Sequence, residues 1–352
     1  MESEVEKICQ LIFSDDNNTQ IAVQLLKGNR DLCQQLEQEF SKPLTILGKK
    51  TFKSIFSLLQ KQRQNKKMSS KEKFALISHP RLAKGIAELH LADYRLSALP
   101  EEIDNLSNLK FIDLRINKLK DLPPNFARLS TLETAYLSHN HFQTFPKVLT
   151  YNQNLTELDL ASNKISSITA DISQLQRLEK LSLAVNLLST LPESITNLTS
   201  LESLNLVENK LKRLPQNLHR LSKLKILNLG GWKHSFNEIP ESLMALSKLK
   251  HLIIASSAYI KNISIIGNCT SLKLLDIGLS KGCSLPNNIG QLQQLIRLSI
   301  TANNNHSIDY LPPSLENLQQ LRTLTIWGHK ISKSEQKKWV EVLPNCQIYF
   351  YN

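Results

Sequence analysis

Residues 109–129 read LKFIDLRINKLKDLPPNFARL, and residues 132–146 continue the same pattern as LETAYLSHNHFQTFP. Both stretches follow the spacing LxxLxLxxNxL, with other apolar residues replacing some of the leucines. Rows of this kind begin every 23 residues from Ile86 to Leu224, and later rows follow at steps of 25, 23, 23 and 26 residues, the last at Leu321. Eleven rows in one phase indicate that most of the 352 residues form one repeated array, not two conventional domains.

The spacing within a row predicts a short strand followed by an irregular return. Two leucines that stand two residues apart, such as Leu181 and Leu183, point to the same side of a strand. Parallel strands of successive rows would stack about 4.8 Å apart, so the inward leucines of one row pack only against neighbouring rows. The second half of a row, as in LPESITNL at residues 191–198, would return through 3-10 or irregular helical turns.

This pattern resembles the leucine-rich repeat family over roughly residues 86–331. The LPxxIxxL half of each row is similar to the intracellular 23-residue class, which is found in Ras-binding scaffolds and in bacterial and plant relatives. Extracellular classes usually have 24-residue rows and cysteine caps, and neither feature is present in this sequence. The resemblance implies an α/β fold: a right-handed solenoid, or horseshoe, with a parallel concave sheet.

Asparagines recur at one phase, where each strand is expected to end. An amide at this point can donate to and accept from backbone groups that the turn leaves unpaired. We therefore expect a structural asparagine ladder. Its predicted members are Asn117, Asn140, Asn163, Asn186, Asn209 and Asn303. Other residues stand at this phase in the remaining rows, namely Tyr94, Trp232, Ser257, Ser280 and His329. The less regular C-terminal rows are open to two interpretations, a binding site or drift in a tolerant array.

An open solenoid exposes apolar residues at both ends and needs polar caps. Residues 1–85 are expected to form a helical N-terminal cap, since apolar residues recur there at helical spacing and residues 69–72 form a capping box. Residues 332–352 are expected to form a C-terminal cap, in which a second capping box at residues 332–335 opens a helix and a final strand follows. The inward residues of that strand would be Cys346, Ile348 and Phe350.

The net charge of +12 is unevenly distributed. Residues 42–84 hold twelve lysines and arginines against one acid, whereas residues 1–41 carry a net charge of −5. A basic segment of this kind can bind nucleic acid or an anionic membrane surface. It can equally be the solvated face of cap helices, and both interpretations stay open.

The sequence offers no arrangement for catalysis, for a cofactor or for a metal. The patterns GxGxxG, GxxxxGK[ST], HExxH and GxSxG are all absent. His139 and His141 only flank a ladder asparagine, and Cys283 has no histidine expected beside it. We therefore expect a non-enzymatic protein.

Cysteine usage and the first residues indicate a reducing compartment. The five cysteines are widely spaced without a CxxC pair, which favours free thiols. The chain opens MESEVE, which is acidic where a secretory signal requires positive charge, and no stretch approaches the ~18 apolar residues of a membrane span. We expect a cytoplasmic monomer.

The residues between the inward leucines would face the concave side of the sheet. The N-terminal rows place acids and aromatics there, and the C-terminal rows place apolar residues, Leu279 among them. This favours a protein or peptide partner that carries basic groups at one end and apolar groups at the other. Scattered exposed apolar residues are also common on surfaces that bind nothing. The candidate partner-binding residues are Phe111, Asp113, Arg115, Tyr136, Glu157, Asp159, Ile226, Ile253, Leu274 and Trp327.

Overall fold

The computed structural model describes Ala83 and residues 86–231, 233–256, 258–302, 307–328 and 330–351. The expected helical cap and the basic 42–84 segment lie outside the described residues, apart from Ala83. The predicted ladder residue Asn303 also lies outside them. The chain divides into two compact units, residues 1–136 and residues 137–352.

The first unit contains three short parallel strands, paired in chain order. They are β1 (Glu88–His90), β2 (Phe111–Asp113) and β3 (Thr134–Tyr136). The returning halves of the rows form the 3-10 turns η2 (Glu101–Asn105) and η3 (Pro124–Arg128). The register aligns Leu89, Ile112 and Ala135, so one inward residue of each row stacks on the next.

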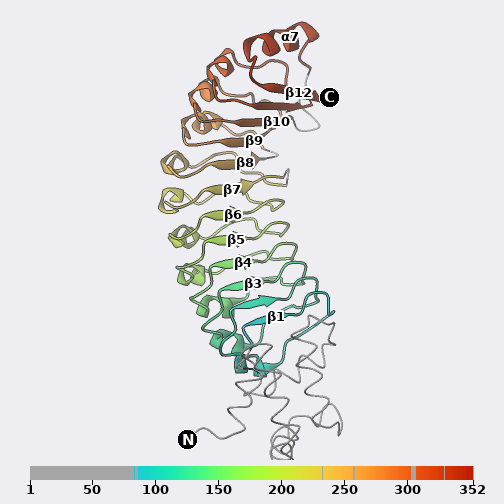
Figure 1. Ribbon diagram of the computed structural model, residues 1–352, viewed down its shortest axis with the longest axis vertical. Coiled ribbons are helices and arrows are strands. Elements are labelled where there is room, and N and C mark those ends of the chain that lie inside the picture. The colour runs from blue at the N-terminus through green and yellow to red at the C-terminus, as the bar shows by residue number, and fades with distance from the viewer. Residues whose placement is uncertain are drawn as a thin grey trace, which may run out of the picture. The chain divides into compact units, whose positions relative to one another are not determined.

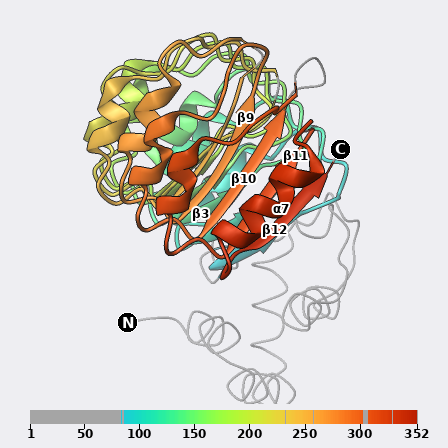
Figure 2. The ribbon, with the colours of Figure 1, turned by 90° about the horizontal axis from the view of Figure 1, so that it is seen from above.

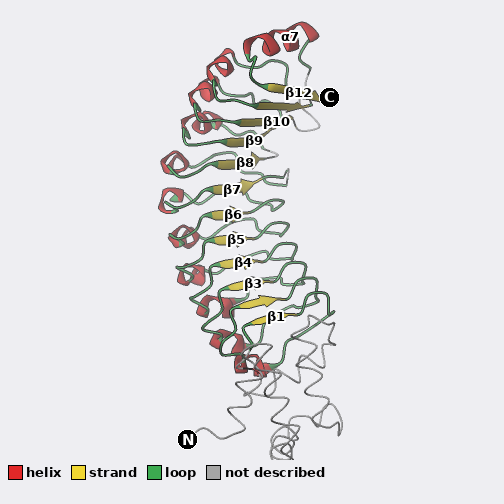
Figure 3. Cartoon of the chain, in the orientation of Figure 1, coloured by secondary structure: helices red, strands yellow, loops and turns green. Residues whose placement is uncertain are grey.

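The second unit repeats this plan with longer strands toward its C-terminal end (Figure 1). Its strands are β4 (Glu157–Asp159), β5 (Lys180–Ser182), β6 (Ser203–Asn205), β7 (Ile226–Leu229), β8 (His251–Ala255), β9 (Leu274–Leu279), β10 (Arg297–Ala302), β11 (Thr323–Trp327) and β12 (Gln347–Tyr351). Its 3-10 turns are η4 (Lys147–Tyr151), η5 (Ala170–Gln174), η6 (Glu193–Asn197), η7 (Leu218–Arg220), η8 (Glu241–Ala245), η9 (Ile263–Asn268), η10 (Asn287–Gln291) and η11 (Pro313–Asn317). The strands pair in parallel and in chain order, and the helical turns form the opposite side of each row (Figure 3).

The core of the second unit lies between the strands and the helical turns. In a typical row, Leu181 and Leu183 from the strand side are fully buried, as are Ile195 and Leu198 from the return. Pro192 has an extended backbone and directly precedes the 3-10 turn η6, so the proline ends the extended segment where the turn begins. The prediction of stacked parallel strands with inward leucines is confirmed.

The ladder asparagines 117, 140, 163, 186 and 209 are buried where the strands end. Asn186 shows their bonding: its amide nitrogen donates to the carbonyl oxygens of Leu160 and Leu183, each at 3.0 Å, and its Oδ1 accepts from the backbone nitrogen of Ile165 at 2.9 Å. The residue before each ladder asparagine, for example Val185 with φ of 53°, has a left-handed backbone. This conformation ends the strand and leaves the backbone groups that the amide then pairs.

In the irregular rows, residues that lie off the regular phase of the repeat take the place of the ladder asparagine. His234 is fully buried, and its Nδ1 accepts the backbone N–H of Leu211 at 3.3 Å, much as Asn209 accepts that of Leu188. Burial lowers the pKa of this imidazole to about 4. In the next row Ser256 donates to the carbonyl oxygen of Phe236 at 2.8 Å. The row from Leu224 has two extra residues, so its ladder position is residue 234 and not residue 232.

The C-terminal end of the second unit carries α7 (Lys333–Val342), which lies beside β12 in both Figure 1 and Figure 2. Ser332 caps this helix, since its Oγ accepts the backbone N–H of Glu335 at 3.2 Å. Strand β12 extends the sheet in the register Leu324–Ile348 and Ile326–Phe350, and Ile348 and Phe350 are half-buried. Leu324 and Ile326 of β11 are fully buried, whereas the β12 residues that lie beside them stay partly exposed themselves.

Candidate binding surface

The open face of each unit consists of the strand side chains that point away from the core. Register aligns them in columns, with one residue from each row. In the first unit one column is Glu88, Phe111 and Thr134, and the other is His90, Asp113 and Tyr136. In the second unit the first column runs through Glu157, Lys180, Ser203, Ile226, His251, Leu274, Arg297, Thr323 and Gln347.

An aromatic cluster covers the open face of the first unit. The ring centroids of His90 and Phe111 lie 5.1 Å apart, and those of Phe111 and Tyr136 lie 5.4 Å apart in an edge-to-face arrangement. The guanidinium carbon of Arg115 lies 5.3 Å from the Tyr136 ring centroid, in the range of a cation–π contact. Three rows thus bring together three of the predicted partner-binding residues, Phe111, Arg115 and Tyr136.

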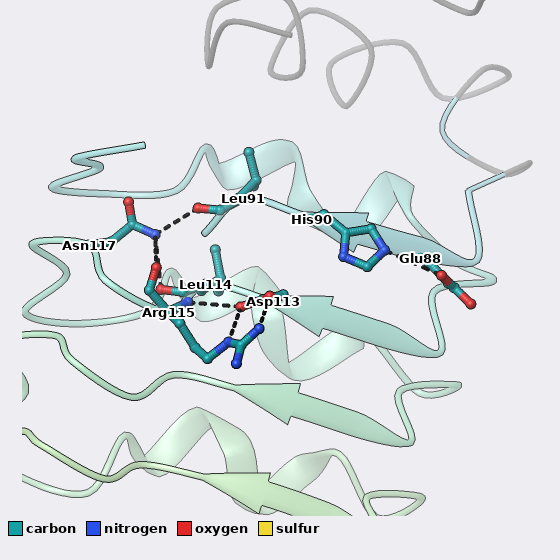
Figure 4. Close-up of polar contacts among 7 residues, drawn as sticks. All are labelled: Glu88, His90, Leu91, Asp113, Leu114, Arg115 and Asn117. Carbon is teal, nitrogen blue, oxygen red and sulfur yellow. Dashed lines mark hydrogen bonds and ion pairs between the residues drawn. The ribbon is translucent and has the colours of Figure 1, made fainter. Parts of the chain in front are cut away.

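Asp113 is engaged within the protein and offers no free carboxylate (Figure 4). Arg115 donates from Nε to Oδ1 at 2.9 Å and from Nη2 to Oδ2 at 2.8 Å, and its backbone N–H also donates to Oδ1 at 3.1 Å. The Asp113 side chain is almost fully covered, at 7% exposed. Burial alone raises the pKa of this carboxyl, but the hydrogen bonds from Arg115 outweigh it and leave the pKa below its ordinary value.

The residues at the phase of Asp113 share a structural role that sequence analysis missed. Asp159, Asn205 and Asn228 each accept the backbone N–H of the residue two positions later, at 3.0, 3.2 and 3.0 Å. Such a contact ends a strand with an Asx turn. The signal was available in the sequence, because Asp or Asn recurs at this phase in several rows.

The acids expected to attract basic groups are therefore partly neutralised by the protein itself. In the first unit the Glu88 carboxylate is engaged in a hydrogen bond with the His90 ring nitrogen at 3.3 Å. In the second unit Glu157 forms an ion pair with Lys180 at 2.9 Å. Less negative charge is thus available on the open face than the sequence alone suggests.

Apolar side chains gather on the C-terminal strands of the second unit. Ile226 is 38% exposed, Trp327 is 45% exposed, and Ile253 and Leu274 are half-buried. The prediction for Leu279 is wrong, because it is only 1% exposed. Strand β9 continues as far as this residue, so alternation turns its side chain toward the core.

Three aromatic rings line the last two strands of this face. Trp327 stacks on Tyr351 with ring centroids 4.0 Å apart and an interplanar angle of 16°, and Tyr349 lies parallel to Tyr351 at 6.3 Å. Both tyrosines are exposed. Of these three rings only Trp327 is among the predicted partner-binding residues, although the alternation predicted for the final strand already turns both tyrosines outward.

The described residues hold no group of three or more His, Cys, Asp and Glu side chains that could bind a metal. Cys269, Cys283 and Cys346 are free thiols, and burial raises the pKa of Cys269 to about 12 and that of Cys346 to about 11. Thiols with raised pKa values, as at Cys269 and Cys346, are poor nucleophiles near neutral pH. No described helix is both long enough and apolar enough to span a bilayer.

Comparison with known proteins supports the repeat assignment. A family model for a leucine-rich repeat region matches residues 87–190 and 192–350. No curated protein matches the chain.

Solved structures share the fold. An internalin (inlF) from Listeria monocytogenes aligns with a TM-score of 0.61 at 22% identity, over 78% of this chain and 83% of that one. The functional domain of InlJ from the same organism aligns with a TM-score of 0.62 at 16% identity, over 78% of this chain and 55% of that one. The ectodomain of the plant receptor kinase GASSHO1/SCHENGEN3 from Arabidopsis thaliana, solved in complex with Casparian strip integrity factor 2, aligns with a TM-score of 0.60 at 26% identity. That alignment covers 78% of this chain but 34% of the receptor chain.

Proposed function

This chain belongs to the leucine-rich repeat family, and on that premise we propose that it is a non-enzymatic module that binds a protein or peptide on the open face of its sheet. The observation that carries this proposal is the group of exposed aromatic rings on neighbouring strands, Trp327, Tyr349 and Tyr351. Contiguous exposed aromatics are costly in water unless a partner covers them, and they are the usual anchors of protein interfaces.

The sheet favours binding because it holds these side chains in place before a partner arrives. Trp327 and Tyr351 are paired in the register of β11 and β12, so the backbone fixes the separation of their rings. A surface that is already ordered loses little conformational entropy on binding. The cluster of Phe111, Tyr136 and Arg115 provides a second ordered anchor on the first unit.

The finer assignment is also part of this proposal. We assign the chain to the intracellular 23-residue class and to the cytoplasm, as a monomer, because its rows keep the 23-residue step from Ile86 to Leu224 and its described cysteines are unpaired. The receptor ectodomain from Arabidopsis, solved with its ligand, offers the alternative of an extracellular role.

A second candidate function rests on the charge of residues 42–84, which carry twelve basic residues and one acid. Such a segment would bind nucleic acid or anionic vesicles through counterion release, with a steep dependence on salt. Titration of the full chain with duplex DNA, and separately with phosphatidylserine vesicles, at 50 and 200 mM salt tests this function. Binding that is absent or independent of salt would exclude it.

Affinity capture with variants of the full chain tests the main proposal. Two double variants each remove one anchor: Phe111→Ala/Tyr136→Ala and Trp327→Ala/Tyr351→Ala. Each should fail to capture a protein that the native chain captures, while its Tm stays nearly unchanged. The matched control Tyr151→Ala/Tyr310→Ala removes two exposed aromatics that lie outside the strands, and it should capture normally. Equal capture by all three variants would reject the open face as the binding site.

A further inference from the structure

One column of residues in the second unit changes its charge sign along the sheet. The column consists of the residue directly before each strand, and backbone hydrogen bonds join its members from row to row. Lys250 N donates to the Lys225 oxygen at 2.9 Å, and Lys273 N donates to the Lys250 oxygen at 2.8 Å. The members that are joined in this way are Thr156, Glu179, Glu202, Lys225, Lys250, Lys273, Ile296 and Arg322. Three consecutive rows therefore each present a lysine at the same edge.

Two further lysines add positive charge beside this column. Lys223 and Lys248 each stand two residues before a column lysine and are exposed. Together with Lys225 they lower the pKa of the Glu202 carboxyl, chiefly through the hydrogen bond from Lys225, whose Nζ lies 2.7 Å from Glu202 Oε2. We call Lys223, Lys225, Lys248, Lys250 and Lys273 the lysine edge.

The lysine edge has an excess of positive charge. Glu202 pairs with Lys225, and the other four lysines form no ion pair with any residue in the described part of the chain. Like charges on neighbouring rows repel one another, and a partner that brings carboxylates relieves this repulsion.

Apolar side chains are interleaved with these charges. Ile226 follows Lys225 and is 38% exposed, while Ile296 continues the column after Lys273 and is 40% exposed. The surface thus combines cations with apolar contacts, which is the composition of a protein interface.

We infer that the lysine edge receives an acidic segment of a protein partner, which crosses the starts of β7, β8 and β9 and places an apolar side chain on Ile226 or Ile296. This inference rests on the proposed function and specifies the charge of the partner. It is opposite in sign to the basic groups expected from the acids of the N-terminal rows.

The surroundings favour a peptide over a nucleic acid. A polyphosphate chain that followed the column past Lys225 would meet Glu202 and Glu179, which repel phosphate. The edge also contains no aromatic ring on which a base could stack, whereas single-stranded nucleic acids usually bind through such stacking.

Selection from a phage library of random twelve-residue peptides, with the full chain as target, tests the inference. Selected peptides should be enriched in Asp and Glu relative to the library. Their affinity should fall about tenfold or more in Lys225→Glu/Lys250→Glu/Lys273→Glu, because three attractions become repulsions. The control Lys164→Glu/Lys210→Glu/Lys212→Glu makes the same change in charge on exposed loops that follow the strands, and it should bind as the native chain does.

The neutral variant Lys225→Gln/Lys250→Gln/Lys273→Gln should fall between the two, and it covers the case in which the reversed charges disturb folding. Selected peptides that lack acidic residues, but still require Trp327 or Phe111, would overturn the inference and leave the proposed function standing. Failure to select any peptide would count against both. A twelve-nucleotide single-stranded DNA that binds the native chain, but no longer binds the Glu variant, would also overturn the inference.

Discussion

Acidification from pH 7 to pH 5 should destabilise the second unit chiefly through His234. The imidazole is fully buried, and its Nδ1 must be unprotonated to accept the Leu211 N–H at 3.3 Å. Burial lowers its pKa to about 4 and outweighs the opposing effects of the Glu208 carboxylate and of backbone carbonyl groups. In the unfolded chain the ring recovers a pKa of about 6.5.

The sign and size of the effect follow from this difference. Because the folded state disfavours the protonated ring, the stabilisation is complete above pH ~6.5 and is lost as the pH falls toward 4. Each unit of pH in this window costs about 1.4 kcal/mol, so the loss is about 2 kcal/mol at pH 5 and about 3 kcal/mol by pH 4.

Urea unfolding of native and variant chains at pH 7 and pH 5 measures this loss. His234→Asn introduces the amide that other rows use, which does not titrate, and it should lose about 2 kcal/mol less than the native chain between the two pH values. His139→Asn changes an exposed histidine with a left-handed backbone, which Asn tolerates, and should keep the native pH dependence. If His234→Asn and the native chain lose equal stability on acidification, the buried neutral ring is not the cause.

Three further perturbations have defined outcomes. Leu183→Ala should lower the free energy of unfolding by about 2–5 kcal/mol in urea titrations, whereas the exposed Leu187→Ala should change it by less than about 0.5 kcal/mol; similar costs would contradict the assigned core. Asn186→Ala should cost about 1–3 kcal/mol, because it leaves buried backbone groups of two rows unpaired, and a neutral result in the same titration would argue against a ladder. Arg115→Ala should raise the pKa of the Asp113 carboxyl, measured by NMR titration, because the side-chain hydrogen bonds and the charge of Arg115 are lost while the effect of burial remains; an unchanged pKa would refute the pairing.

The repeated rows were predictable because periodicity acts locally. Two leucines two residues apart must share one side of a strand, so Leu181 and Leu183 could be assigned to the core without coordinates. Prediction failed at Leu279, where the strand runs longer than in the regular rows, and the alternation that buries this residue depends on that length. The sequence predicted which residues lie on the candidate surface, but not which of its acids are bound by neighbouring groups of the protein.

The amino-acid sequence by itself determined the array of rows, the inward leucine stripe and the phase of the ladder asparagines, because each depends on spacing along one chain segment. Only the tertiary structure decided that Arg115 pairs with the Asp113 carboxylate and that His234 takes the place of an asparagine. It also decided that Lys225, Lys250 and Lys273 form one edge. These features depend on which side chains meet, either across rows or around an irregular turn. Small changes in row length and backbone conformation alter those side-chain contacts but leave the leucine pattern intact.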